Sequence, residues 1–110
     1  MNKKGKNMEL TYEMQGDRLV VSVPRELDHH VAQSMSREID FLADTWHAKT
    51  VLFDFSETEF MDSSGIGVLI GRKKNMEMHN GTVLVRNLGE RAGKIFEKSG
   101  LNRIIKELPV

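Results

Sequence analysis

The hydrophobic positions near the start of the chain alternate with polar ones, as expected for strands. Residues 8–15, MELTYEMQ, have a mixed strand pattern, and residues 17–24, DRLVVSVP, have a clearer one. Gly16 and Asp17 lie between the two runs and are a turn signal, so the sequence predicts a β-hairpin. Pro24 ends the second strand, because proline cannot donate a backbone hydrogen bond to a sheet.

Three further runs predict strands later in the chain. Residues 50–55, TVLFDF, and residues 82–86, TVLVR, are short and apolar, which is typical of strands buried on both faces of a sheet. Residues 102–109, NRIIKELP, are expected to form the last strand. Each of these three runs follows a stretch with helical spacing.

The stretches between these strands carry apolar residues three or four positions apart, the spacing of an amphipathic helix. Asp28 is a suitable N-cap for the first helix, predicted from about His29 to Trp46. The second helix begins after the segment FMDSSG and stops at Asn80-Gly81, and the third occupies residues 89–100. The predicted apolar stripes contain Val31, Met35, Ile39, Leu42, Trp46, Ile66, Leu69, Ile70, Met76, Ala92, Ile95 and Phe96.

The order of these elements, strand-strand-helix-strand-helix-strand-helix-strand, predicts an α/β fold. Its mixed, mostly parallel sheet of about four to five strands would have the helices packed on it. Residues 1–7 are expected to be a flexible N-terminal tail, and residues 8–110 to form one domain. In such sheets the functional site usually lies where a strand hands over to a helix. The segment FMDSSGIG, residues 60–67, lies at such a point.

Composition narrows the classes of function. The 110 residues carry 16 Lys and Arg against 16 Asp and Glu, which argues against a general nucleic-acid binder. The chain has no cysteine, so disulfides and thiolate metal sites are excluded. No apolar run approaches the roughly 20 residues needed to span a bilayer, and the basic start MNKKGKN has no apolar stretch behind it. We therefore expect a cytoplasmic protein without a membrane partner.

The serine pair at positions 63 and 64 does not match a hydrolase. A nucleophile elbow needs Gly-x-Ser-x-Gly, and the place of the first glycine is taken by Met61 for Ser63 and by Asp62 for Ser64. A chain of this length also leaves few places to build a substrate pocket. We therefore expect no catalytic residue on this chain.

The glycines near the start of the second helix do not match a nucleotide-binding motif either. Gly65 and Gly67 begin a dinucleotide fingerprint, but Ile70 stands where its third glycine is expected, and no Gly-Lys-Ser/Thr follows. Gly67 and Gly71 lie four positions apart on one helix face, and each costs about 1 kcal/mol against alanine. Close packing of the helix on the sheet is the expected compensation.

The sequence DHH, residues 28–30, suggests a metal site, but its spacing is unfavourable. Adjacent helical residues point about 100° apart, so His29 and His30 cannot easily share one ion. A capping aspartate followed by two surface histidines is the favoured interpretation. We expect neither a metal ion nor a cofactor in this chain.

Two roles remain open for the serine pair from the residues alone. Asp62 or Ser63 could cap the second helix, with Ser64 in its first turn. Ser63 also presents a hydroxyl at a helix N-terminus, where the amides and the dipole favour an anion. A phosphoryl group there would add about −1.5 to −2 charges near Asp62 and Asp28. Ser63 is therefore a candidate phosphorylation switch as well as a candidate cap.

Three segments resemble a known family. FMDSSGIGVLIGRKK closely resembles the phosphorylation segment of the anti-sigma factor antagonists, which are STAS domains. ELDHHVA resembles that family's first helix start, and KSGLNRII resembles its ending. The similarity extends from about Met8 to Leu108, and DHH together with FMDSSG points to the sporulation stage II AA type.

The resemblance implies transcription regulation by partner switching. In that family the unphosphorylated antagonist binds an anti-sigma factor that is also a serine kinase, and this binding frees the sigma factor. The kinase uses ATP to phosphorylate the first serine of Asp-Ser-Ser, the product dissociates, and a serine phosphatase resets it. Ser63 would be the phosphoacceptor of this chain. The chain would be a substrate and not an enzyme, and we expect a monomer when it is free.

The resemblance also implies a partner-binding surface. Gly65 would leave room for the nucleotide of the kinase, Ile66 would be an apolar contact, and Arg72 would reach the partner from further along the helix. The implied surface consists of Asp28, Asp62, Ser63, Ser64, Gly65, Ile66 and Arg72.

The chain departs from the family pattern at Arg25, where the family often has glycine, and it ends at Val110, where members commonly continue into a helix. The first departure could alter the turn that leads to Asp28, and the second the covering of the sheet edge. Two alternatives stay open: a STAS scaffold that is never phosphorylated, and a small nucleotide-binding protein.

Overall fold

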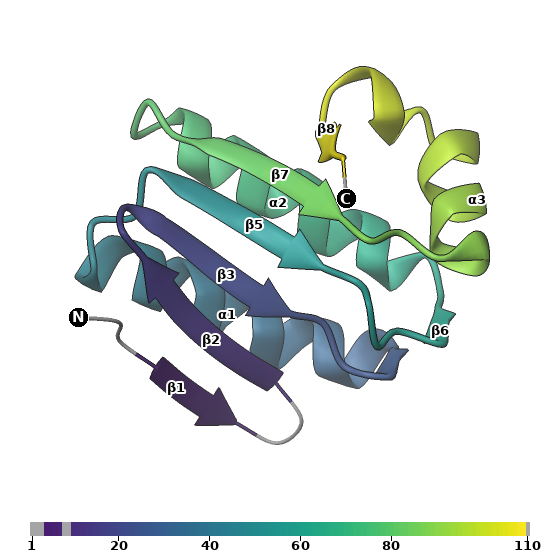
Figure 1. Cartoon of the computed structure of the whole chain (residues 1–110), viewed down its shortest axis with the longest axis horizontal. Helices are drawn as coiled ribbons and strands as arrows, with labels where there is room; N and C mark the ends of the chain where they lie inside the picture. Colours follow the sequence, from purple (N-terminus) through teal and green to yellow (C-terminus); the bar gives the residue numbers. More distant parts are fainter. Residues whose placement is uncertain (1–3, 8–9, 110) are drawn as a thin grey trace.

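A six-stranded mixed sheet forms the centre of the molecule, and two long helices cross one of its faces (Figure 1). The computed structural model describes residues 4–7 and 10–109. The strand order in the sheet is β1 (Lys4–Asn7), β2 (Leu10–Gln15), β3 (Arg18–Ser22), β5 (Thr50–Asp54), β7 (Thr82–Arg86) and β8 (Lys106–Leu108). The pairs from β1 to β3 are antiparallel, and those from β3 to β8 are parallel.

The helices are α1 (His29–Thr45), α2 (Ser64–Glu77) and α3 (Glu90–Lys98). Helices α1 and α2 lie side by side behind the sheet, and α3 lies at the end where the parallel strands finish (Figure 1). A short 3-10 helix, η1 (Leu101–Arg103), connects α3 to β8. The predicted α/β fold with a mixed, mostly parallel sheet is confirmed.

The core lies between the sheet and the first two helices. The three central strands β3, β5 and β7 contribute buried residues to it. Val21, Phe53 and Val85 are in register on these strands, and none of them is exposed. Met35 and Ile39 of α1 are equally buried in the same cluster, as predicted from their spacing. The remaining members of the α1 stripe are only partly buried: Val31, Leu42 and Trp46.

The hairpin and the first helix cap form as the sequence predicts. Gly16 has a φ of 66°, which allows the two-residue turn between β2 and β3. Asp28 Oδ1 accepts a hydrogen bond from Val31 N at 3.0 Å and so caps α1.

The two ends of the sheet differ from the sequence prediction. Residues Lys4–Asn7, expected to belong to a flexible tail, form β1 and pair with β2, so the sheet has six strands instead of four to five. Residues 1–3 of that tail lie outside the described residues. The last strand is shorter than predicted, because Leu101–Arg103 turn as a 3-10 helix and bury Leu101. Both differences lie at the edges of the sheet.

The prediction that Gly67 and Gly71 allow close packing on the sheet is wrong. A Cβ atom at either position would meet no atom within 4 Å. The close approaches occur at Gly65 and Gly81; a Cβ on Gly81 would lie 2.9 Å from the backbone oxygen of Lys49. No helix in the described part of the chain is long and apolar enough to cross a membrane.

Candidate functional site

A second, two-stranded sheet, which was not predicted from the sequence, leads into the segment that contains the serine pair. Strands β4 (Glu26–Leu27) and β6 (Phe60–Met61) pair in parallel, with Leu27 opposite Met61. Asp62 N donates to Leu27 O at 3.3 Å and extends the pairing by one step. Two residues per strand are too few for the alternation that reveals a strand in a sequence, which is why this element was missed.

The two strands place Asp28 and Asp62 next to each other, and each begins a helix. Asp28 caps α1, as described above. Asp62 Oδ1 accepts a hydrogen bond from Ser64 N at 2.8 Å and so caps α2. Ser63 already has helical backbone angles, φ −63° and ψ −14°, and its side chain makes no capping hydrogen bond. Of the two capping candidates in the sequence, Asp62 performs the role.

Ser63 is exposed, and the amides that follow it are already occupied. Besides Ser64 N, Gly65 N donates to Asp62 O at 3.1 Å, and Ile66 N donates to Ser63 O at 3.1 Å. We predicted that the first amides of α2 could receive an anion, but these three have partners within the chain. An anion on Ser63 would gain from the helix dipole alone and would stay on the surface.

Gly65 is needed for the packing of α2 on the small sheet. A Cβ atom there would lie 2.5 Å from Met61 Sδ and 3.1 Å from Leu27 Cδ2, both in buried side chains. The space at Gly65 is therefore filled by the core of this chain. That Gly65 also leaves room for a nucleotide stays a prediction.

The remaining predicted residues of the first turn are partly committed to the fold. Ser64 and Ile66 are half-buried, and Ile66 packs against the hydrophobic core. Asp28 and Asp62 are half-buried as well. The structure thus brings six of the seven predicted partner-binding residues together at the start of α1 and α2, with Ser63 the most accessible.

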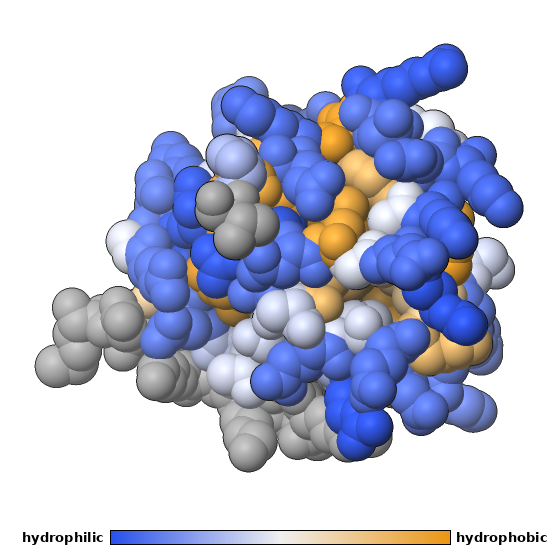
Figure 2. All heavy atoms as spheres, turned by 45° about the vertical axis from the view of Figure 1, so that its right-hand side comes forward, coloured by the Kyte–Doolittle hydropathy of each residue, from blue (hydrophilic) through white to orange (hydrophobic). Residues whose placement is uncertain are grey.

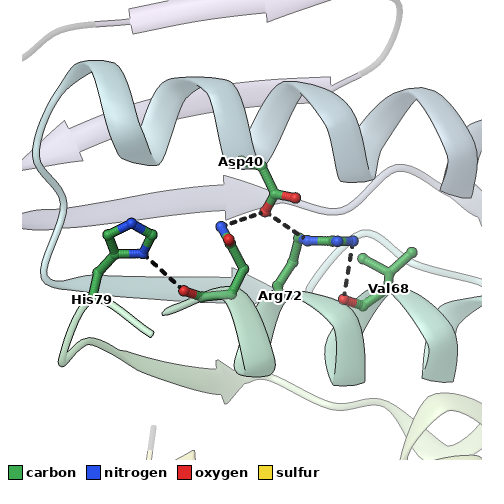
Figure 3. Close-up of polar contacts among 5 residues, drawn as sticks. Asp40, Val68, Arg72 and His79 are labelled. Carbon is green, nitrogen blue, oxygen red and sulfur yellow. Dashed lines mark hydrogen bonds and ion pairs between the residues drawn. The ribbon is translucent and has the colours of Figure 1, made fainter. Parts of the chain in front are cut away.

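Arg72 lies apart from this group. Its Nε atom donates to Asp40 Oδ1 at 2.8 Å, and Asn75 Nδ2 donates to the same oxygen at 3.1 Å, which joins α2 to α1 (Figure 3). The Arg72 side chain is only 13% exposed. This geometry gives Arg72 a structural role between the helices and does not support the predicted partner contact.

A carboxylate that the sequence analysis overlooked anchors the loop before β6. Asp54 accepts hydrogen bonds from Ser56 N at 2.9 Å, from Arg86 Nε at 3.1 Å and from Asn87 Nδ2 at 3.1 Å. Burial alone would raise the pKa of Asp54, but these hydrogen bonds outweigh it and hold the pKa below its ordinary value. The feature of the sequence that could have identified Asp54 is its position at the carboxyl end of an apolar strand.

Comparison with known proteins agrees with this fold and with the predicted resemblance. The STAS domain profile matches residues 9–109. The chain belongs to the STAS domain family. This STAS domain is 30% identical over 100 residues to the anti-sigma F factor antagonist of Paenibacillus polymyxa, covering 89% of this chain and 86% of that protein. It is 30% identical over 83 residues to the Lysinibacillus sphaericus protein of the same name, covering 76% and 71%.

Two similar solved structures are of the anti-sigma factor antagonist SpoIIAA. The unphosphorylated form superimposes with a TM-score of 0.81 at 28% identity, covering 91% of this STAS domain and 88% of that chain. The phosphorylated form, from Bacillus, has a TM-score of 0.73 at 28% identity and covers 91% of both chains. The predicted STAS fold is confirmed.

Proposed function

We propose that this STAS domain is an anti-sigma factor antagonist whose partner binding is switched at Ser63. Unphosphorylated, it binds an anti-sigma factor that is also a serine kinase, and the sigma factor is released. The relatives that carry the name anti-sigma F factor antagonist support this proposal, as does the similarity to SpoIIAA, which has been solved with and without phosphorylation. The observation that carries it is the exposed Ser63 side chain, left out of the helix cap beside two capping carboxylates.

The transfer step needs only an oxygen nucleophile from this chain. Ser63 Oγ attacks the γ-phosphorus of ATP held by the kinase, and the bond to the β,γ-bridging oxygen breaks. ADP leaves, and the hydroxyl proton passes to a base of the kinase. A phosphatase then uses water to hydrolyse the phosphoserine to serine and inorganic phosphate. In this proposal the chain has no cofactor of its own and is a cytoplasmic monomer when free.

The phosphoryl group acts on the partner and leaves the fold in place. It adds about −1.5 to −2 charges at a surface that already carries Asp28 and Asp62. Because the first amides of α2 have partners within the chain, they do not bind the phosphate, which therefore remains exposed to the partner. Blocked contact and repulsion together weaken binding by about 10²-fold or more.

Binding to purified anti-sigma factors from the encoding organism tests the proposal. The Paenibacillus polymyxa antagonist and its own anti-sigma F factor confirm that the assay works. Wild type and Ser63→Ala are expected to bind one of these factors with similar affinity, and Ser63→Asp about 10²-fold more weakly. The melting temperature of Ser63→Asp should equal that of wild type. Wild-type affinity in Ser63→Asp, or no binding of wild type to any of the factors, contradicts the proposal.

A further inference from the structure

An exposed aromatic side chain lies three residues before Ser63. Phe60 is 39% exposed, whereas Met61 beside it is 2% exposed and belongs to the core. Successive residues of a strand point to opposite faces, so the ring of Phe60 lies on the outer face of the small sheet. On that face it is in register with Glu26 of β4, which is also exposed.

Arg91 of α3 lies over the ring of Phe60. Its guanidinium carbon lies 5.7 Å from the ring centroid, the geometry of a cation–π contact. A ring that already has a contact on one face loses less conformational freedom on binding than a ring without one, which favours affinity. Aromatic and arginine side chains are also the types most often found at the energetic centre of interfaces.

Charged side chains surround the ring. A shallow hollow of about 320 Å³ is lined by Arg25, Glu26, Glu59 and Phe60, and Arg25 forms an ion pair with Glu59. Figure 2 brings forward the side of the molecule where β6 and α3 lie, and small apolar areas appear there between mostly hydrophilic side chains. An apolar centre with a charged rim is the usual anatomy of a protein–protein interface.

An interface of ordinary size around Ser63 would also include the surface at Phe60. A specific complex buries about 800 Å² on each partner, far more than one serine and its neighbours can supply. A kinase whose ATP reaches Ser63 must therefore cover the surrounding surface, and β6 leads directly into Asp62 and Ser63.

The other exposed large apolar side chains of the described residues lie elsewhere. Phe41 is 67% exposed but lies 12 residues beyond the start of α1, about 18 Å along the helix. Met78 is 80% exposed and follows the far end of α2, about 21 Å from its start. Ile104 is 55% exposed and follows η1.

We propose that Phe60, in contact with Arg91, is an anchor residue that the anti-sigma factor covers when it engages Ser63. This inference rests on the proposed function and adds a specific contact to it. The partner surface of this chain then extends from the helix caps across β6 to α3. Phe60 contributes affinity in both the binding and the phosphorylation reactions.

Phe60→Ala and Phe41→Ala form a matched pair of variants, because each removes an exposed phenyl ring. We expect Phe60→Ala to weaken binding to the purified anti-sigma factor at least about tenfold, with a higher KM and unchanged kcat for phosphorylation. Phe41→Ala should change neither by more than about twofold. Phe60→Leu keeps an apolar side chain at this position and serves if Phe60→Ala folds poorly; its expected loss of binding is about threefold to tenfold.

Ser63→Asp, measured beside these variants, separates this inference from the proposed function. If Ser63→Asp loses binding while Phe60→Ala and Phe60→Leu bind within twofold of wild type, Phe60 is not an anchor and only this inference is overturned. Equal losses in Phe60→Ala and Phe41→Ala overturn it as well, because the effect would not be local. Wild-type binding by Ser63→Asp overturns the proposed function itself.

Discussion

Asp28 and Asp62 occupy equivalent positions, each directly after one of two paired parallel strands, and each caps the helix that follows. The pairing of Leu27 with Met61 and the bond from Asp62 N to Leu27 O set this arrangement. The carboxylates accept bonds from Val31 N and Ser64 N, so both are held rigidly. Ser63 thus lies beside two fixed negative charges on a surface that the fold defines without using the serine hydroxyl.

The capping bond of Asp62 should contribute measurably to stability. We expect Asp62→Ala to lower the free energy of unfolding by about 1 kcal/mol, and Asp62→Asn to change it little, because asparagine caps as well as aspartate. Urea denaturation followed by circular dichroism measures both. Equal losses in the two variants would mean that the charge matters more than the capping bond.

Gly65 and Gly67 should respond to alanine in opposite ways. Gly65→Ala places a Cβ 2.5 Å from Met61 Sδ and should lower the free energy of unfolding by about 1 to 2 kcal/mol. Gly67→Ala enters open space in the same helix and should raise it by about 1 kcal/mol through helix propensity. Thermal and chemical denaturation of the two variants make the comparison. A stabilised Gly65→Ala would contradict the close packing of Gly65 against Met61.

The Arg72–Asp40 pair should affect stability and not partner binding. Because Arg72 is largely buried between the helices, Arg72→Ala should cost about 1 to 2 kcal/mol of unfolding free energy. Lys73→Ala, which breaks the more exposed pair with Glu77, should cost less than about 0.5 kcal/mol. Affinity for the anti-sigma factor is expected to stay within twofold in both. A selective loss of affinity in Arg72→Ala would restore the partner contact implied by the resemblance.

Asp54 should make the fold sensitive to acid. Its pKa is lower in the folded chain than its ordinary value of 3.8, so its contribution to stability is present above that pH and is lost as pH falls through the folded pKa. Wild type should be more stable than Asp54→Asn at pH 7, and the difference should shrink below about pH 4. Denaturation midpoints between pH 7 and pH 3 test this. A difference that is constant over this range would contradict it.

The sequence was sufficient for the elements that have a strong period or a specific cap. The stripe at Met35 and Ile39, the cap at Asp28 and the turn at Gly16 all form as predicted. Each of these signals acts within one turn or one hairpin. The residues within each element were therefore enough to predict it.

The features that were not predicted from the sequence depend on contacts between residues far apart in the chain. Strands β4 and β6 have two residues each and exist because residues near 26 and 60 meet. The same tertiary contacts decide that Gly65, and not Gly67 or Gly71, needs to be glycine. They also turn Arg72 towards Asp40, which no spacing along α2 could indicate.

The most direct test of the proposed switch is the mass of the chain after incubation with Mg-ATP and the purified anti-sigma factor that it binds, followed by peptide mapping. We predict a single added phosphoryl group on Ser63, retained in Ser64→Ala and absent from Ser63→Ala, with dissociation of the complex once it is added. A phosphoryl group on Ser64 would keep the switch and contradict the acceptor. No phosphorylation, with a kinase that is active on its known antagonist, would contradict the switch and favour a scaffold that is never phosphorylated.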